Sequence, residues 1–257
     1  MARQNSLAKT SIDVFKKYSP LLILALLWEF CSRTGLVSQY ALPPLTDVLA
    51  SFRWLTTDTA FFTHAGMSLG RAGLGLLLAV TFGIVMGTLM ASFRSVDALV
   101  GPLVQTLYPM PKSALIPLTI MWFGLGHSSK IFLIFLGCLL PITIATYNGV
   151  KGVDRVLMWS GASLGASRLQ RIIDISFMAA QPAILAGLRT SLALSFVLLV
   201  SSELVMSNEG LGFLIRMLGD GGLYAEMFAV ILTVVAMGFV SDRLIQLLTA
   251  RVLRWRD

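Results

Sequence analysis

Long apolar runs constrain the fold of this 257-residue chain more than any other feature. A hydrocarbon core about 30 Å thick takes roughly 20 apolar residues per helical crossing. Runs such as 74–85 do not show the ten-residue alternation of apolar and polar residues that is typical of membrane β-barrels. We therefore expect an all-α integral membrane protein with about six transmembrane helices. The expected spans are residues 20–37, 68–91, 98–124, 131–150, 184–206 and 227–249.

Composition excludes most soluble classes of protein. Only 13% of the residues are charged and 56% are hydrophobic, with a mean hydropathy of +0.80, whereas a soluble domain carries roughly 25% charged residues. The formal net charge of +7 does not form one basic patch, because Lys and Arg stand at the ends of the apolar runs. That distribution indicates a topology signal, and we expect no nucleic-acid partner.

The positive charges also predict the orientation and the domains. Most Lys and Arg fall on one side if the N-terminus is cytoplasmic, and the other side receives chiefly Arg53, Lys130 and Arg216. We expect both termini in the cytoplasm: a polar N-terminal segment over 1–19, one transmembrane domain over 20–250, and a tail over 251–257. The first apolar run lacks an Ala-x-Ala cleavage pattern, so we interpret it as an uncleaved span.

Motifs for chemistry within the chain are absent from the sequence. There is no P-loop, no nucleophile elbow and no His-Glu-x-x-His, and both histidines stand alone. Cys31 and Cys138 lie in apolar runs, which argues against a metal site. We expect no catalytic residue, no metal and no cofactor in this chain. Energy for any transport would come from a partner.

The third apolar run is rich in proline, at positions 102, 109, 111 and 117. Proline breaks the helical hydrogen-bond ladder, which a membrane tolerates where protein or a water-filled cavity satisfies the freed groups. A broken helix beside a translocation pathway, at Pro109, Pro111 and Lys112, and a simple kink both remain open. Lys112 would either attract an anion or extend its ammonium to the interface.

Charge inside a membrane span is costly and points to function. Glu203, near the outer end of the fifth span, is a candidate for the pathway. Pairing with a basic residue such as Arg71 or Arg189, or an interfacial position that reaches water, are the alternatives. Glu29 and Arg33 are four residues apart on one helix, and we interpret them as a structural pair.

Gly83 and Gly87 form a Gly-x-x-x-Gly pair in the second span. Such spacing lets two helix backbones approach closely. We favour tight packing inside one subunit over a seam between two subunits.

Two segments between spans carry further candidates. Residues 151–183 are predicted to form two short helices that meet at a bend near Gly165, with a basic amphipathic second helix closed by Pro182. This element suits docking of another protein, and a basic loop lying on anionic lipid is the alternative.

On the other side, residues 207–226 contain a short apolar helix. We interpret it as an outer gate or a contact for a binding protein, with a plain surface helix as the alternative; the gate candidates are Gly210, Leu211, Gly212 and Phe213.

The bend lies in the run Leu164-Gly165-Ala166-Ser167-Arg168, and Pro182-Ala183-Ile184 follows it. This pattern resembles the coupling loop, called the EAA loop, of binding-protein-dependent ATP-binding-cassette importers. Further motifs resemble the branch with sulfonate, taurine and nitrate permeases. They include Leu42-Pro43-Pro44, Ser68-Leu69-Gly70-Arg71, Tyr108-Pro109-Met110-Pro111, Glu203-Leu204 and Gly210-Leu211-Gly212. Trp159-Ser160-Gly161 stands where the family usually has Glu-Ala-Ala, so the acidic residue of the motif is missing.

The resemblance implies a non-enzymatic permease subunit of an ATP-driven importer, with the five-helix core of type I importers and a location in the bacterial inner membrane. It implies three partners: cytoplasmic ATPase subunits that bind ATP and Mg, a periplasmic or lipid-anchored substrate-binding protein, and a second permease subunit in a homodimer. The branch suggests a small organic or inorganic anion such as a sulfonate, taurine, nitrate or aromatic carboxylate. The coupling residues would be Trp159, Leu164, Gly165, Ala166, Ser167, Arg168, Leu169 and Pro182.

Three other classes of protein stay open. An ion-coupled secondary transporter should show internal repeats and ionisable residues at the midplane, and neither is evident in the sequence. A membrane enzyme should show clustered His, Asp or Cys residues near one face. A scaffold without transport activity remains open because of the missing coupling-loop glutamate.

Overall fold

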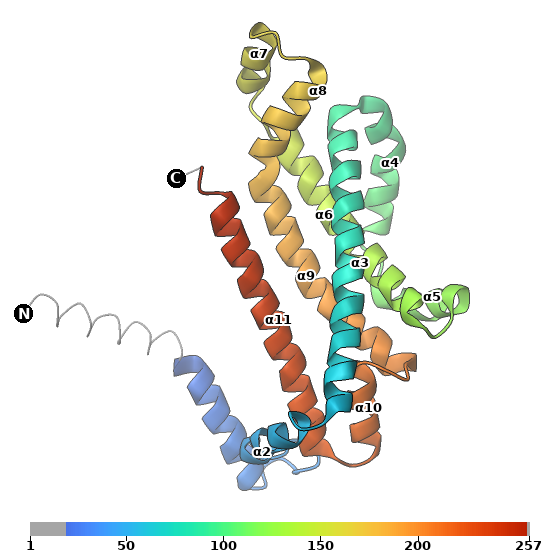
Figure 1. The fold of residues 1–257 in the computed structure, drawn as a ribbon, viewed down its shortest axis with the longest axis vertical. Helices are drawn as coiled ribbons and strands as arrows, with labels where there is room; N and C mark the ends of the chain where they lie inside the picture. The colour runs from blue at the N-terminus through green and yellow to red at the C-terminus, as the bar shows by residue number, and fades with distance from the viewer. Residues whose placement is uncertain (1–18, 256–257) are drawn as a thin grey trace, which may run out of the picture. The chain divides into compact units, whose positions relative to one another are not determined.

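The computed structural model describes residues 19–255, which are predominantly helical and contain no β-strand (Figure 1). The all-α prediction is therefore confirmed. Four helical stretches in this part of the chain are long and apolar enough to cross a membrane: Thr59–Ser92, His127–Lys151, Arg168–Val205 and Tyr224–Val252. They correspond to the second, fourth, fifth and sixth expected spans.

The described residues form two compact units, and the first comprises residues 19–62 and 214–232. It contains a helix over 19–33, which ends before the expected limit of 37, and α2 (Leu45–Leu55). The Trp28 indole donates a 2.8 Å hydrogen bond to the Pro43 carbonyl and meets the Phe228 ring edge-on. Arg33 Nε lies 2.5 Å from Glu29 Oε1, which confirms that pair. The expected segment 1–19 falls almost wholly outside the described residues.

The second unit comprises residues 63–213 and 233–257. Two helices, α10 and α11, run from one unit into the other, and α3 begins in the first unit. The elements of this unit are α3 (Thr59–Ser92), α4 (Arg94–Leu107), the 3-10 helix η1 (Lys112–Leu115), α5 (Ile116–Phe123), α6 (His127–Lys151), α7 (Arg155–Ser163), α8 (Arg168–Gln170), the π-helix η2 (Arg171–Phe177), α9 (Met178–Met206), α10 (Leu211–Asp220) and α11 (Tyr224–Val252).

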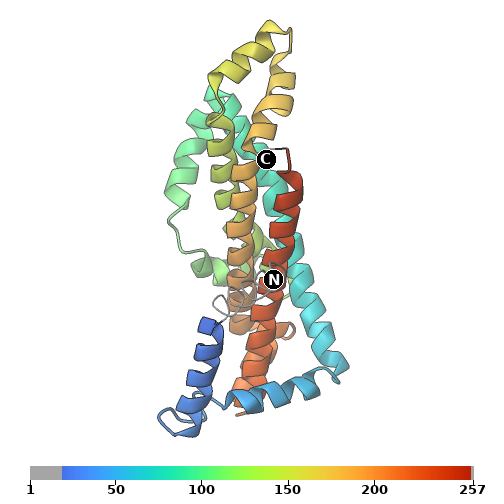
Figure 2. The ribbon, with the colours of Figure 1, turned by 90° about the vertical axis from the view of Figure 1, so that its left-hand side faces the viewer.

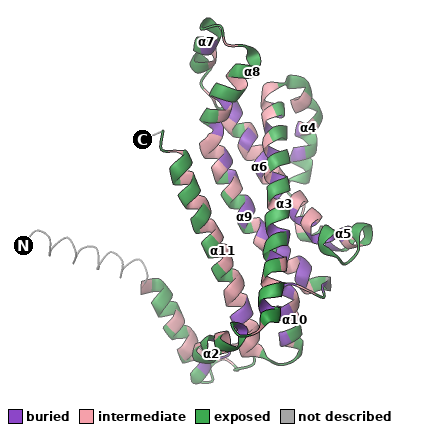
Figure 3. Ribbon diagram, viewed as in Figure 1, coloured by how far each residue is buried: buried purple, intermediate pink, exposed green. Residues whose placement is uncertain are grey.

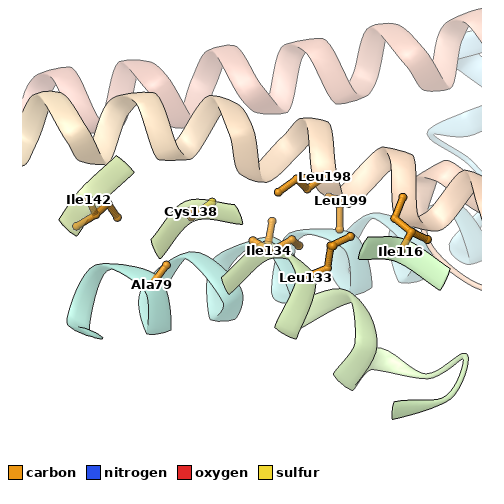
Figure 4. Close-up of a cluster of buried hydrophobic side chains, with 9 residues drawn as sticks. Ala79, Ile116, Leu133, Ile134, Cys138, Ile142, Leu198 and Leu199 are labelled. Carbon is orange, nitrogen blue, oxygen red and sulfur yellow. The ribbon is translucent and has the colours of Figure 1, made fainter. Parts of the chain in front are cut away.

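The core of the second unit lies where α3, α6 and α9 meet (Figure 4). Apolar side chains fill it, including Leu133, Ile134 and Leu199, each at most 1% exposed. Glycine brings the helices close: a Cβ atom built on Gly187 of α9 would lie 2.5 Å from the Ala145 Cβ of α6. Dispersion contacts between closely approaching helices hold this packing, because lipid supplies no hydrophobic drive between them.

The Gly-x-x-x-Gly pair packs inside the subunit, as predicted. A Cβ atom on Gly83 would lie 2.9 Å from Ile142 Cγ2, and one on Gly87 would lie 2.5 Å from the Thr143 carbonyl oxygen. Gly73, on the same helix, has nothing within 4 Å of such an atom. Helix α3 can therefore approach α6 only because these two positions lack side chains.

Gly87→Ala is expected to destabilise the protein by about 1–3 kcal/mol, because the added methyl group meets backbone and the two helices must separate. Gly73→Ala is the matched control, and we expect no loss there. Thermal unfolding of the two purified variants in detergent measures the difference. Equal melting temperatures would contradict the packing described above.

The third expected span, 98–124, is not one helix. Helix α4 ends at Leu107, and the chain continues through residues 108–111 into η1 and α5. Pro109 and Pro111 supply no backbone N–H at this point, so the helical ladder cannot continue. Pro102, by contrast, lies inside α4, and Pro117 lies in the first turn of α5, where the missing N–H costs little.

Helix α11 differs from α6 and α9 in its surface. Its only buried residues among those described are Ala229 and Val230, and Figure 3 shows exposed positions along most of it. Most of the exposed side chains are apolar, with Val235, Phe239, Val240 and Leu247 each more than half exposed. Such a surface suits lipid or another membrane subunit.

Candidate functional site

The segment 151–183 begins with a well-formed short helix, α7. The Asp154 carboxylate accepts a 2.8 Å hydrogen bond from the Val156 N–H and so caps the helix start. At the other end, the Ala166 N–H bonds the Gly161 carbonyl and the Gly165 N–H bonds the Ala162 carbonyl. This pair of bonds is a Schellman motif, and it requires a left-handed residue, which Gly165 supplies with φ of 84°.

The second helix starts directly after this bend. Ser167 and Gln170 form a capping box, in which the Ser167 Oγ accepts from the Gln170 N–H and the Gln170 Oε1 accepts from the Ser167 N–H. The predicted bend near Gly165 is thus confirmed. The prediction of a second short helix closed by Pro182 is wrong, since α8 continues through η2 into α9 with Pro182 inside it. One missing N–H kinks a membrane helix and need not end it.

The helical hairpin of α7 and α8 (yellow in Figure 2) is part of the second unit. Close packing and Arg168 fix it to the rest of that unit. A Cβ atom on Gly161 would lie 2.6 Å from Ile175 Cδ1, so α7 rests directly on η2. Arg168 Nη2 donates a 2.8 Å hydrogen bond to the Ser92 carbonyl at the end of α3, and its guanidinium lies 4.8 Å from the Phe93 ring centroid. The hairpin is therefore a positioned element.

The hairpin brings most of the predicted coupling residues together on an exposed tip. Leu164 is 88% exposed, and Trp159 and Leu169 are each more than 60% exposed. These three exposed apolar side chains surround a tight bend and form a small apolar surface, which we call the hairpin tip. Its further members are Gly165, Ala166, Ser167 and Arg168, whereas Pro182 lies within α9, outside the bend.

The second candidate region is the break between α4 and α5. The Lys112 ammonium donates to the carbonyls of Leu107 at 2.6 Å, Met110 at 2.9 Å and Tyr108 at 3.3 Å. These are the carbonyls that the broken helix leaves without helical partners. Lys112 therefore stabilises the break, and its positive charge stays next to it. Pro109 and Pro111 are exposed on the same connection.

A pocket of about 410 Å³ opens beside this break, between η1, α6 and α9. Its polar wall carries the side chains of Tyr108, Lys112, Ser113 and Thr190. The apolar wall is formed by Met110, Pro141, Leu194, Val197 and Leu198. The Lys112 charge attracts an anion although its N–H groups bond backbone carbonyls, and the Thr190 hydroxyl donates to the Ala186 carbonyl at 3.2 Å. The Tyr108 and Ser113 hydroxyl groups can donate to oxygen atoms of a ligand, so the pocket suits a small amphiphilic anion.

Lys112→Met is expected to destabilise the protein by about 1–3 kcal/mol, since three carbonyl oxygens lose a charged donor. Lys112→Arg keeps the charge and the donors and should retain most of the stability. The melting temperatures of the two purified variants measure this. A methionine variant as stable as the wild type would show that the three hydrogen bonds carry no net stabilisation.

Glu203 occupies a fully buried polar site at the outer end of α9. Its carboxylate accepts from Arg71 Nη1 at 2.6 Å, from the Ser68 hydroxyl at 2.8 and 3.0 Å, and from the Gly212 N–H at 3.0 Å. Glu203 is 0% exposed and Arg71 is 3% exposed. Of the alternatives in the sequence, pairing with Arg71 is the one observed. A carboxylate enclosed in this way presents no surface to a passage in this structure.

The same network reaches two further segments. Arg71 Nε donates to His127 Nδ1 at 3.0 Å, at the start of α6. Arg71 also bonds the Glu209 carbonyl at 3.0 Å and lies 3.4 Å from the Glu209 carboxylate. Sequence reasoning missed Ser68, His127 and Glu209. Arg71 was the available signal, because an arginine within an apolar run needs acceptors nearby.

Lys130, one of the charges expected on the side opposite the termini, is buried in the structure. The residue is 2% exposed. Its ammonium donates to the carbonyls of Leu125 at 2.6 Å and Gly126 at 3.2 Å, just after α5. Lys130 thus donates hydrogen bonds to backbone carbonyls after α5, as Lys112 does at the end of α4.

The four gate candidates are held by this buried site. A Cβ atom on Gly210 would lie 2.3 Å from Glu203 Oε1, and Gly210 has a φ of 105°. Its N–H donates to His64 Nδ1 at 3.0 Å, and the Leu211 N–H donates to the Ser68 hydroxyl at 2.8 Å. The Phe213 ring lies 5.7 Å from that of His64. The start of α10 is therefore anchored to α3 and α9.

The chain is similar in sequence to known membrane transport proteins. Residues 79–254 match the family model described as "Binding-protein-dependent transport system inner membrane component". The chain is 34% identical, over 238 residues, to the putative aliphatic sulfonates transport permease of Bacillus subtilis, covering 93% of this chain and 86% of that protein. It is 32% identical to the taurine transport system permease of Escherichia coli, covering 91% and 87%.

Solved structures show the same fold. An inward-facing structure of the MetNI methionine ABC transporter aligns with a TM-score of 0.62 at 18% identity, covering 76% of this chain and 95% of that one. A crystal structure of an amino acid ABC transporter with histidines aligns with a TM-score of 0.58, covering 79% and 97%. Both likenesses cover about three quarters of this chain and support the type I importer architecture.

Proposed function

The chain belongs to the family of binding-protein-dependent transport inner membrane components, and from that premise we propose that it forms the membrane passage for a small organic anion of the sulfonate class. It is a permease subunit of an ATP-binding-cassette importer and not an enzyme. ATP hydrolysis takes place on a separate subunit. Its partners are that ATPase and a substrate-binding protein.

The proposed substrate class rests on the pocket beside the broken helix. Lys112 provides a positive charge there, and Tyr108, Ser113 and Thr190 provide hydroxyl groups. The part of the chain that lines this pocket contributes no carboxylate. The Lys112 charge would attract a sulfonate group, which could accept from the Tyr108 and Ser113 hydroxyl groups while its alkyl chain lies against Leu194 and Val197. The names of the aliphatic sulfonate and taurine permeases agree with this class.

We further propose that the hairpin tip docks on the ATPase. Its apolar side chains are exposed although the hairpin itself is fixed by Gly161 and Arg168. Movement of the ATPase would reach α9 directly, because α8, η2 and α9 are one continuous helical segment. A mechanical link of this kind needs no flexible loop. Glu203 and Arg71 then serve to hold the outer segment 207–213 on the helices that move.

The remaining expectations belong to the same proposal. The positive charges place both termini and the hairpin tip in the cytoplasm of a bacterial inner membrane. Residues 20–250 act as one permease domain. A second copy of this chain completes the passage, and the exposed apolar residues of α11 suit either that copy or lipid.

The direct test is reconstitution of the chain in proteoliposomes with its ATPase and binding protein. Uptake of a radiolabelled alkanesulfonate should require ATP, and vesicles prepared without the ATPase should show none. Uptake driven by an imposed proton or sodium gradient, without ATP, would contradict the importer and favour a secondary transporter. ATP-dependent uptake of other solutes but not of sulfonates would refute the substrate class alone.

A further inference from the structure

A second polar pocket, of about 310 Å³, lies where the hairpin of α7 and α8 meets the ends of α3 and α6. Ser92 belongs to the last turn of α3, and Lys151 is the last residue of α6. Arg168 and Arg171 enter from the second helix of the hairpin, and Met158 enters from α7. The pocket is separate from the one beside Lys112, since the two share no lining residue.

Two polar groups in this pocket are buried without a partner. Arg171 Nε and the Ser92 hydroxyl oxygen are inaccessible to solvent, and neither has a hydrogen-bond partner among the residues that the structure describes. Burial of an unsatisfied donor costs roughly 1–3 kcal/mol. Both residues line the same pocket, so a small side-chain movement on binding would bring both groups to one ligand with several acceptor oxygens.

No acidic side chain of the described pocket lining neutralises the positive charges of Arg168 and Arg171. No carboxylate stands among its described lining residues, and no salt bridge there joins Arg168 or Arg171 to an acid. Arg168 uses Nη2 on the Ser92 carbonyl, and Arg171 uses Nη1 on the Met158 carbonyl at 3.5 Å. Each guanidinium therefore keeps further N–H groups. Lys151 differs, because Asp97 lies 3.6 Å from its ammonium and Tyr147 also bonds it.

We propose that this pocket binds a tetrahedral oxyanion, a phosphate or sulfonate group, held by Arg168, Arg171 and the Ser92 hydroxyl. Guanidinium groups match such oxygens in geometry as well as in charge. The bound group would tie α8 and η2 to the end of α3 and so stiffen the base of the hairpin tip. The inference stands on this geometry and does not depend on which solute the protein carries.

Two sources can supply this chemistry. The pocket is built from the ends of two spans, α3 and α6, and therefore lies at the level of the lipid headgroups. The phosphate of an anionic phospholipid could enter from the bilayer, and a free oxyanion could enter from the adjoining solution. The experiment separates these sources by presenting each one alone.

The full-length chain is placed in nanodiscs of phosphatidylcholine, and its melting temperature is followed as inorganic phosphate is added. A saturable rise indicates a free oxyanion. In a second arm, phosphatidylglycerol replaces part of the lipid without phosphate in the buffer, and a rise there that phosphate does not increase indicates the lipid headgroup. No change of the melting temperature in either arm overturns the proposal.

Three single variants test which side chains bind the oxyanion. Ser92→Ala removes one oxygen atom, and Arg171→Lys keeps the charge but loses the planar fork; each should weaken binding about tenfold, as expected for one hydrogen bond to a charged group. Arg155→Gln removes a neighbouring exposed charge of α7 that does not line the pocket, and binding should be unchanged. If Arg155→Gln weakens binding as much as the other two, diffuse surface charge explains the effect and the site is refuted. Should Arg171→Lys fold poorly, Ser92→Ala alone decides.

Discussion

Arg71→Met is expected to lower the free energy of unfolding by about 3–5 kcal/mol, because it leaves the Glu203 carboxylate buried without its cation. The Ser68 hydroxyl and the Gly212 N–H remain as donors, but neither carries a charge. The loss should appear as poor accumulation in the membrane and as a strongly reduced melting temperature in detergent. We also expect the segment 207–210 to become sensitive to protease, since Arg71 holds Glu209 as well.

The double variant Arg71→Met/Glu203→Gln should recover part of this stability, because no unpaired charge is left in the protein. Arg33→Met is the matched control: its pair with Glu29 is as short, at 2.5 Å, but the Arg33 side chain is 61% exposed. We expect a much smaller change there. If Arg71→Met and Arg33→Met melt alike, or if the double variant is no better than the single one, burial does not govern the role of this ion pair.

Leu164→Arg should abolish co-purification of the ATPase and ATP-driven transport while the permease stays folded. Leu164 is 88% exposed at the hairpin tip, so no packing within the chain is lost. A charge in the centre of an apolar docking contact typically costs several kcal/mol of binding, about a thousandfold or more in affinity. Affinity capture of the tagged permease, followed by quantification of the ATPase, measures this.

Leu36→Arg is the control for an added charge on an exposed leucine, since Leu36 is 70% exposed in the loop after the first helix. It should retain the ATPase. Leu164→Met should also retain it, because the side chain stays apolar and similar in volume. Full retention of the ATPase by Leu164→Arg would remove the hairpin tip from the interface and with it the proposed route of coupling.

The hairpin also gives the unusual Trp159-Ser160-Gly161 run a physical role. The resemblance predicts Glu-Ala-Ala here, and an alanine in place of Gly161 would bring its Cβ within 2.6 Å of Ile175. Glycine lets α7 rest closer to η2 than alanine would. Trp159 then points its large side chain outward, 64% exposed, where the family's acidic residue usually stands. The contact with the ATPase is therefore expected to be more apolar in this protein.

Much of the fold follows from local sequence. Apolar length predicted the spans that α3, α6, α9 and α11 form, since a helix in lipid satisfies all of its backbone groups by itself. The bend at Gly165 followed from glycine's access to positive φ, and the interruption of the third run followed from its prolines. These properties depend on a few neighbouring residues, so they are readable without knowledge of the rest of the chain.

Tertiary structure alone decided the partners of the buried polar groups. Glu203 lies 132 residues from Arg71 in the sequence, and nothing local distinguishes Arg71 from Arg189 as its partner. Lys130 stands just before an expected span, where the sequence indicates a loop. It is nevertheless buried, because its ammonium donates to a carbonyl after α5. Likewise, only the structure shows that α8 continues into α9 across Pro182. Sequence thus determined which segments cross the membrane, whereas the geometry between segments determined which charges are neutralised and which buried groups, such as Arg171 Nε, have no partner among the described residues.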